Sequence, residues 1–142
     1  MEIVSLSDHN EILKAFGEIK AAFPDFEKEV NLSDYLKKLS DFARVYAAVD
    51  NMETVGFCAA YMNDEIKREA YITLFGVKNE RKRSGVGTQL FEKVCDEAKK
   101  AGMTSLRLEV KKSNQAARAF YEKQNMTHDG ENETSYFLVK QL

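Results

Sequence analysis

The feature that most constrains the fold is a glycine-containing turn, SGVG at residues 84–87, that joins a strand-like run to a helix-like pattern. The run before it, AYITLFGV at 70–77, is rich in β-branched and aromatic residues and predicts a strand. From Val86 onward apolar residues recur at helical spacing, and Gly102 is placed to end this helix as a left-handed cap. SLRLEV at 105–110 predicts a further strand. Together these segments predict a β-α-β unit within a mixed α/β sheet.

The segments on either side of this unit also alternate between strand and helix patterns. Asp8 and Glu11 have the spacing of a capping box at a helix start, and we expect Pro24 to end that helix. The first helix carries apolar residues at Ile12, Phe16, Ile19 and Phe23, and a second helix carries Leu32, Tyr35, Leu36 and Leu39 on one face. The other expected elements are strands at 2–6, 44–50 and 54–63, a helix at 113–125, and a hairpin that turns at DGEN, 129–132. The predicted order is β-α-α-β-β-β-α-β-α-β-β, an α/β (α+β) fold with helices on both faces of the sheet.

Length and composition indicate one domain over residues 1–142. Hydrophobic residues make up 44% and charged residues 31% of the chain, a balance typical of soluble proteins. The net charge of −2 creates no overall field that would attract nucleic acid or a membrane surface. The first residues lack a signal-peptide pattern, and no apolar run approaches the roughly 20 residues of a membrane helix. We therefore expect a cytoplasmic protein with no nucleic-acid partner and no membrane partner.

The cysteines and histidines do not form a metal-binding pattern. Cys58 and Cys95 lie in apolar segments, where buried free thiols are expected rather than a disulfide or a nucleophile. His9 and His128 are far apart in the sequence, and no cysteine accompanies either of them in a cluster. We predict no metal site.

The turn between strand and helix has the chemistry of a pyrophosphate cradle. The first N–H groups of a helix have no partner inside it and bind phosphate, and Gly85 and Gly87 let an anion approach the backbone closely. Lys82, Arg83 and Ser84 add charge and donors beside the turn. The sequence has no Walker loop, and Leu90 occupies the third glycine position of a dinucleotide fingerprint. On the glycines alone, a plain tight turn is the stronger interpretation.

Two longer blocks change that balance. VKNERKRSGVGTQLF, 77–91, resembles the acetyl-CoA-binding motif of the GNAT superfamily of N-acetyltransferases, with Lys82 at the family's arginine or glutamine position. LRLEVKKSNQAARAFYEKQNM, 106–126, resembles the second cofactor segment of the same family, and Asn125–Met126 replace the usual Gly-Phe pair. The second block places Glu109, Asn114, Ala117, Phe120 and Tyr121 on family positions. The resemblance extends over about residues 70–142.

The resemblance implies a mixed, mostly antiparallel sheet of six or seven strands and direct acetyl transfer from the cosubstrate acetyl-CoA to an amine. It also implies that strand 70–77 separates at its end from strand 105–110, and that the pantetheine arm of the cofactor lies in the gap. The cofactor-binding residues that it implies are Phe75, Gly76, Val77, Lys82, Arg83, Ser84, Gly85, Val86, Gly87, Thr88, Asn114 and Ala117. Phe75 and Val77 are also expected in the core, and Asn114 is also a suitable helix N-cap.

Tyr121 is the predicted general acid, because a phenol near the sulfur can donate a proton to the leaving CoA thiolate. A packed aromatic on an amphipathic helix is the alternative interpretation, and the place of Tyr121 seven residues after Asn114 favours the catalytic role. Glu109 is the candidate general base for the amine, acting through water. A solvated charge or a partner for Arg107 explains Glu109 equally well, and Glu69, Tyr71 or no single residue are further alternatives.

The acceptor is expected to be a primary amine of a small molecule, a peptide or a protein, bound by the helical pair 8–42 and the hairpin near 127–138. Asp25, Glu27, Glu29 and Asp34 give one loop an acidity that would attract a cationic amine, although an ordinary solvated loop is the stronger interpretation. A non-catalytic acetyl-CoA-binding module is the alternative function, and a homodimer is left open. The basic residues of 78–83 also suggest nucleic acid, but Glu80 interrupts them and no aromatic lies among them, so contact with a CoA phosphate is favoured.

Overall fold

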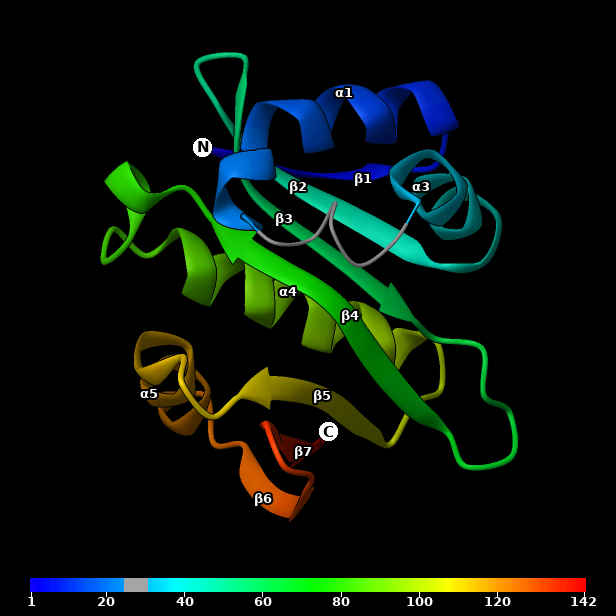
Figure 1. Ribbon diagram of the computed structural model, residues 1–142. Helices are drawn as coiled ribbons and strands as arrows, with labels where there is room; N and C mark the ends of the chain where they lie inside the picture. Colours follow the sequence, from blue (N-terminus) through cyan, green and yellow to red (C-terminus); the bar gives the residue numbers. More distant parts are fainter. Residues whose placement is uncertain (25–30) are drawn as a thin grey trace.

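A single sheet with the strand order β1-β2-β3-β4-β5-β7-β6 organises the computed structural model, which describes residues 1–24 and 31–142 (Figure 1). The strands are β1 (Glu2–Leu6), β2 (Arg44–Asp50), β3 (Glu53–Tyr61), β4 (Glu69–Val77), β5 (Ser105–Lys111), β6 (Thr127–Glu131) and β7 (Ser135–Gln141). The helices are α1 (His9–Ile19), α3 (Leu32–Phe42), α4 (Val86–Lys100) and α5 (Gln115–Lys123), with short 3-10 turns η1 (Lys20–Ala22) and η2 (Asn79–Arg81). Only β4 and β5 pair in parallel, because α4 crosses between them. The predicted element order and the mixed, mostly antiparallel sheet are confirmed.

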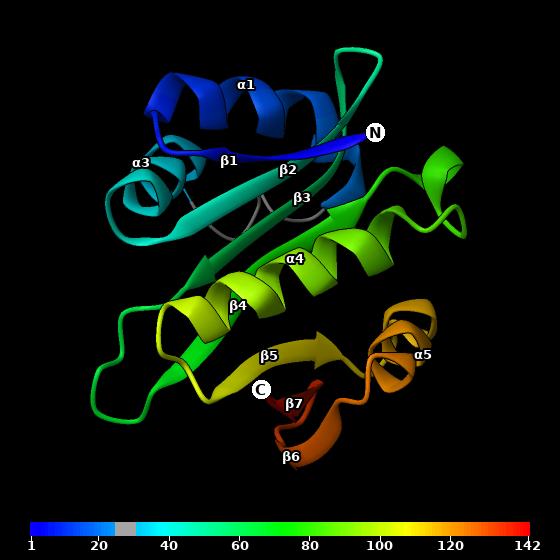
Figure 2. The same ribbon diagram turned by 180° about the vertical axis from the view of Figure 1, so that it is seen from behind.

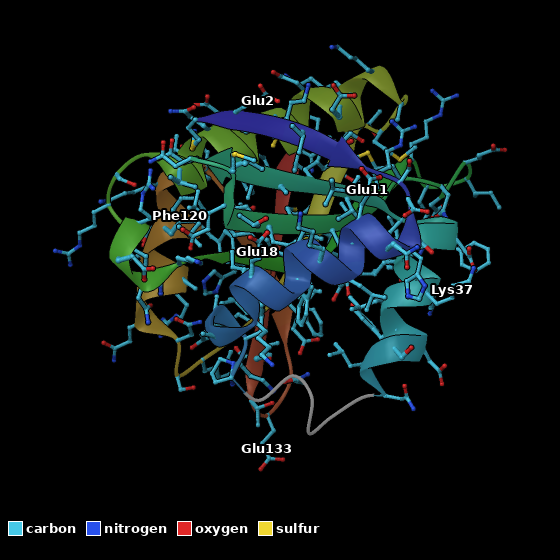
Figure 3. The ribbon with its side chains drawn as sticks, turned by 90° about the horizontal axis from the view of Figure 1, so that it is seen from above. Glu2, Glu11, Glu18, Lys37, Phe120 and Glu133 are labelled. Carbon is cyan, nitrogen blue, oxygen red and sulfur yellow. The ribbon has the colours of Figure 1, made fainter. Side chains whose placement is uncertain are left out.

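The helices cover the two faces of the sheet unequally. α1 and α3 pack over one face of the β1–β4 half, and α4 lies across the opposite face with α5 beside its first turns (Figures 1 and 2). Figure 3 shows these layers from above, with α1 and its Glu11 and Glu18 on the other side of the strands from α4. The two larger buried clusters lie on opposite faces of the sheet, one containing Phe16 of α1 with Phe57 of β3, and one containing Phe91 of α4 with Leu108 of β5.

The start of α1 is the predicted capping box. The Asp8 carboxylate accepts from the N–H groups of Asn10 at 3.1 Å and Glu11 at 3.3 Å, and the Glu11 carboxylate accepts from the Asp8 N–H at 3.4 Å. The helix ends at Ile19 and continues as the 3-10 turn η1, so the expectation that it runs to Pro24 was wrong. Phe23 still contacts the first helix, because its ring stacks on Phe16 with the centroids 5.6 Å apart.

The C-terminal hairpin turns later than DGEN. Asp129 and Gly130 lie within β6, where Gly130 has a φ of +103° and the register with β7 shifts between His128 and Glu131. The chain reverses instead after Asn132, whose side-chain oxygen accepts from the N–H groups of Thr134 at 3.0 Å and Ser135 at 2.7 Å. Such an Asx turn supplies the local hydrogen bonds that the DGEN assignment placed three residues earlier.

Among the helices of residues 1–24 and 31–142, none has the length and apolar character that crossing a membrane requires.

Candidate active site

The candidate site begins where β4 and β5 stop pairing. Their parallel register runs from Glu69 opposite Ser105 to Ile72 opposite Leu108, and β4 then continues to Val77 without a partner on that side. Figure 1 shows the two strands side by side at one end and apart at the other. The backbone of residues 73–77 therefore presents an edge toward the gap that no strand fills. The predicted separation of these strands is confirmed.

A β-bulge accounts for the bend of β4 at this point. Ala60 of β3 lies opposite Ile72 and Ala59 lies opposite Leu74, so Thr73 is an extra residue on β4. A bulge bends its strand and increases the local twist, which turns the second half of β4 away from β5.

The turn before α4 presents a series of free N–H groups. The first backbone bond of the helix is donated by Gln89 to the carbonyl of Gly85 at 3.0 Å. The N–H groups from Arg83 to Thr88 have no hydrogen-bond acceptor in the described part of the chain. Arg83 and Gly85 both adopt left-handed backbone conformations, with φ of +68° and +89°. An arrangement of this kind at a helix start carries partial positive charge and binds anions.

The basic residues beside this turn divide into two pairs. Lys78 forms an ion pair with Glu53, and the Arg81 guanidinium bonds the Asp50 carboxylate at 2.6 Å. Hydrogen bonding to Arg81 lowers the pKa of Asp50 below its ordinary value. Lys78 and Arg81 thus attach the turn to the β2–β3 hairpin. Lys82 and Arg83 are exposed and form no ion pair with any residue in 1–24 or 31–142.

Packing against α5 also favours glycine at position 87, and sequence analysis missed this contact. A β-carbon at this position would lie 3.2 Å from Cε1 and 3.4 Å from Cζ of Phe120 on α5. The glycine therefore lets α4 and α5 approach closely, in addition to leaving the helix start open. A Gly87→Val change would disturb this packing, so it does not isolate phosphate binding.

Aromatic rings line the gap on its α4 side. The Phe75 ring stacks on Phe120 with centroids 5.6 Å apart and meets the Tyr121 ring at 6.1 Å, and Phe91 of α4 completes the group. Tyr121 is 7% exposed, so it is a packed aromatic of the core. Burial raises the pKa of its hydroxyl well above the ordinary 10.0, and the Cys58 thiol nearby raises it further. The phenol is therefore neutral and can act as a hydrogen-bond donor.

The two ends of α5 have the geometry expected from the sequence. The Asn114 side-chain oxygen accepts from the N–H of Ala117 at 3.1 Å, which makes Asn114 the N-cap, and Ala117 packs partly buried on the core. After the helix Asn125 has a φ of +65°, the left-handed conformation that a glycine would take, and Met126 is buried. The substitutions that replace the usual Gly-Phe pair thus preserve the backbone shape and the core filling.

Glu109 lies on the opposite side of the sheet from Tyr121. Its strand neighbours Leu108 and Val110 point into the α4 cluster, so the exposed Glu109 faces the side of α1 and α3. Burial raises the pKa of Tyr71, and the charge of nearby Glu109 raises it further.

The interpretation of Glu109 as the partner of Arg107 was wrong. Arg107 instead forms an ion pair with Asp129 and donates to the Asp129 carbonyl at 3.2 Å. Glu109 has no ion pair within the residues that the structure describes, and it sits one residue beyond the last β4–β5 pair. Glu69 accepts from the Ser105 hydroxyl at 3.3 Å at the paired end, six residues or roughly 20 Å of strand from Phe75. Of the two carboxylates, Glu109 is the one at the gap.

Other predicted residues have the following places. Asp25, Glu27 and Glu29 lie outside the described residues, and Asp34 is exposed in the first turn of α3. Cys58 and Cys95 are buried free thiols, as predicted, and burial raises the pKa of Cys95 to about 11. Within residues 1–24 and 31–142, no group of three His, Cys, Asp or Glu side chains is placed to hold a metal ion.

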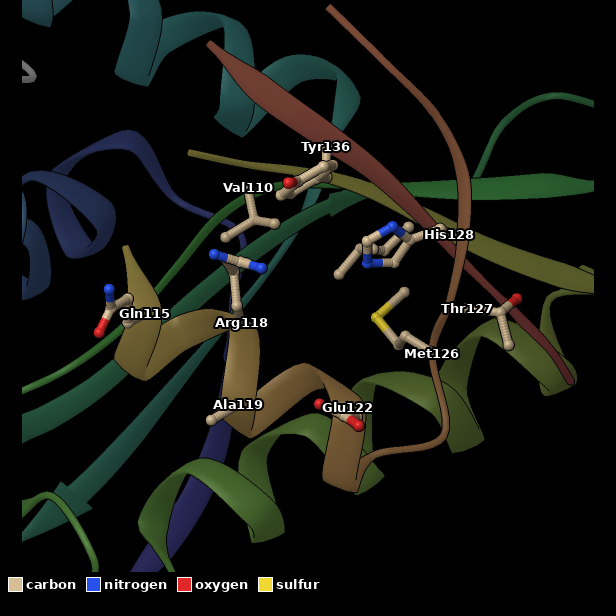
Figure 4. Close-up of a pocket in the computed structure, with 10 residues that line it drawn as sticks. Val110, Gln115, Arg118, Ala119, Glu122, Met126, Thr127, His128 and Tyr136 are labelled. Carbon is tan, nitrogen blue, oxygen red and sulfur yellow. The ribbon is translucent and has the colours of Figure 1, made fainter. Parts of the chain in front are cut away.

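A cavity of about 540 Å³ lies between α5 and the β6–β7 hairpin (Figure 4). Arg118 and Glu122 line it from α5, and His128 and Tyr136 line it from the strands. None of the predicted cofactor-binding residues lines it, because it borders the face of α5 that points away from the gap.

Comparisons with known proteins show the family and the fold of the chain. The model of the acetyltransferase (GNAT) family matches residues 10–126, and no curated protein sequence matches the chain. An acetyltransferase structure from Bacillus anthracis, in complex with acetyl coenzyme A, has a TM-score of 0.65 and 24% identity over 71% of this chain and 63% of that chain.

Two further structures match over almost the whole chain. The PaiA N-acetyltransferase from Thermoplasma acidophilum, in complex with coenzyme A, has a TM-score of 0.76 and 18% identity over 100% of both chains. An aminoglycoside 6′-N-acetyltransferase complexed with coenzyme A has a TM-score of 0.82 and 18% identity over 99% of this chain and 97% of that chain. These likenesses support the fold. With the family model matching most of its length, the chain belongs to the acetyltransferase (GNAT) family.

Proposed function

We propose that this protein is an acetyl-CoA-dependent N-acetyltransferase, an acyltransferase that moves the acetyl group directly to a primary amine. The observation that carries the proposal is the position of the free N–H groups of residues 83–88 at the same end of the sheet as the open gap between β4 and β5 (Figure 1). One site offers a cradle for a diphosphate and the other offers a slot for an extended arm, and acetyl-CoA has both parts. The bound coenzymes in the three matched structures, acetyl-CoA in one and CoA in two, support this assignment.

The diphosphate is held, in this proposal, by the start of α4. The backbone donates the hydrogen bonds, and the two basic side chains without an ion pair supply charge. The residues assigned to this part are Lys82, Arg83, Ser84, Gly85, Val86, Gly87 and Thr88. The Ser84 hydroxyl donates to the Arg81 carbonyl, so Ser84 contributes through its N–H.

The pantetheine arm lies along the free edge of β4. Phe75, Gly76 and Val77 provide the backbone groups, and the start of α5, with Asn114 and Ala117, closes the opposite wall. An N–H of β4 at this point also polarises the thioester carbonyl, because a fixed donor stabilises the negative charge that develops on that oxygen.

Residues on the two sides of the gap then assist the transfer of the acetyl group. The neutral amine attacks the carbonyl carbon, a C–N bond forms, and the C–S bond breaks with the electron pair leaving on sulfur. Glu109, on the side of α1 and α3, takes the proton that the amine loses, through a water molecule. Tyr121, on the side of α4, donates a hydrogen bond to the developing thiolate.

The raised pKa of Tyr121 refines its role. An ordinary thiol has a pKa of about 8.5, so full transfer of the phenolic proton to the thiolate is unfavourable. Tyr121 therefore stabilises the leaving group as a donor, and the proton that finally reaches sulfur comes from solvent or from the proton released by the amine. For the same reason, no loss of activity at high pH should arise from Tyr121 within the usual assay range.

The acceptor is a primary amine of a small molecule, a peptide or a protein. The side of α1 and α3 is the side from which it approaches, because Glu109 and Tyr71 face that way. We place the reaction in the cytoplasm as the work of one domain, and the buried free thiols fit a reducing compartment. No metal enters the proposed reaction, and a homodimer is compatible with it.

The test is amine-dependent release of CoA from acetyl-CoA, measured across a panel of primary amines, with mass spectrometry of the acetylated product. Direct transfer predicts intersecting initial-rate lines, whereas a covalent acetyl-enzyme predicts parallel ones. Tyr121→Phe should lower kcat by about 10²- to 10³-fold, the usual cost of one donor at a developing charge. Tyr136→Phe, outside the gap, is the matched control. CoA binding without release by any amine would establish the non-catalytic binding module instead.

A further inference from the structure

Thr73 occupies a position unlike any other in β4. As the extra residue of the bulge it has no partner on β3, and the pairing with β5 has already ended at Ile72. Every other residue of β4 pairs with at least one of these two strands. The pivot at which β4 turns away from β5 is therefore the point where the sheet holds it least.

A side chain from another element holds this pivot. The Tyr35 hydroxyl and the Thr73 hydroxyl are hydrogen-bonded, and they lie 38 residues apart in sequence. Tyr35 is on α3, which is anchored on the sheet by the fully buried Leu36 and Leu39. The bond is partly buried, and burial raises the pKa of Tyr35, so its hydroxyl keeps its proton across the neutral range.

We propose that Tyr35 is a positioning residue that sets the width of the gap between β4 and β5 by fixing the bulge at Thr73. The proposal rests on the proposed function for its consequence, because the gap is where the pantetheine arm is placed. Removing the hydroxyl leaves the bulge without its only side-chain hydrogen bond among the described residues, and residues 74–77 then move relative to β5. The cradle at the start of α4 does not depend on this bond.

Loss of the bond between Tyr35 and Thr73 should weaken binding of CoA selectively. Tyr35→Phe keeps the ring and removes the hydroxyl, and it should weaken CoA binding by about 2- to 12-fold, the factor for one ordinary hydrogen bond. The nucleotide fragment of CoA that ends at the diphosphate uses the cradle alone, so its affinity should stay unchanged. A general loosening of the fold would weaken both ligands together.

A double-mutant cycle assigns the effect to the bond itself. Thr73→Val should weaken CoA binding as much as Tyr35→Phe, and the double variant should be no weaker than either single variant. Tyr61→Phe is the matched control, because Tyr61 is a half-buried tyrosine on β3 whose hydroxyl has no hydrogen-bond partner in the described structure. Its affinity for CoA should equal that of the wild type.

Amide hydrogen exchange measures the same bond without any ligand. In Tyr35→Phe and in Thr73→Val, exchange should become faster at residues 74–77 and stay unchanged in β2. Unchanged exchange at 74–77, additive losses in the cycle, or equal weakening of CoA and its fragment would each overturn the role of Tyr35. If the wild type binds neither ligand, the proposed function fails, and the exchange measurement still decides whether Tyr35 holds the bulge.

Discussion

β4 and β5 run side by side at one end and separate at the other, and the two ends differ in what holds them. At the paired end, Ala70 and Leu106 lie opposite each other, bonded through the backbone and fully buried under α4. At the open end no backbone ladder joins the two strands, and β4 packs instead against α5, with the Phe75 ring against the rings of Phe120 and Tyr121. The ladder gives stability at one end, and its absence gives access to backbone donors at the other.

The difference arises from one extra residue in one strand. The bulge at Thr73 turns β4 away from β5 after Ile72. Because α4 begins shortly after β4 ends, the free N–H groups at the start of α4 lie at the same open end. The candidate site is thus formed by the free edge of β4 together with the starts of α4 and α5. A substitution at the paired end should act on folding, whereas one at the open end should act on the ligand, and the following variants test that division.

The largest effect is expected at the paired end. Leu106 is fully buried, and Leu106→Ala removes apolar contacts and leaves a cavity under α4. The free energy of unfolding should fall by about 2–5 kcal/mol, measured by denaturant titration. Under conditions in which the Leu106→Ala variant is still folded, its dissociation constant for CoA should equal that of the wild type. Leu13→Ala on the exposed side of α1 is the control for stability. A loss of CoA affinity without a loss of stability would break the division between the two ends.

A smaller effect is expected from the charges beside the open end. Lys82→Ala should weaken CoA binding by about 2- to 5-fold, the scale of one exposed charge contact, and less at high salt. Lys78→Ala is the matched control, because Lys78 is four residues away and is already paired with Glu53. Isothermal titration at low and high salt would measure both. Equal losses from the two lysines would show that general charge, rather than the cradle, attracts the ligand.

Sequence analysis identified the features of this fold that are local in the chain. The capping box at Asp8, the left-handed Gly102 and the helical spacing from Val86 depend on residues within a few positions of one another. The DGEN turn failed for a related reason, because an Asx turn three residues later competes with it through an equally local hydrogen bond.

Predicting the candidate site required information of two other kinds, a resemblance to a family and the three-dimensional structure. The separation of β4 and β5 was expected only from the resemblance to a family, since nothing in the two strand sequences marks where pairing stops. The bulge at Thr73, its bond to Tyr35 and the pairing of Arg107 with Asp129 depend on contacts between residues far apart in the chain. Spacing within one segment does not encode such contacts, so they required the structure.

An NMR titration with acetyl-CoA tests whether the cradle and the open end of β4 bind acetyl-CoA together. If they do, the backbone amide signals of residues 75–77 and 83–88 should shift together along one binding curve. The paired end, residues 69–71 and 105–107, should move little. The opposite outcome is a titration in which these amides stay fixed at millimolar acetyl-CoA, or in which the largest shifts fall on residues 126–128 and 136 around the cavity beside α5.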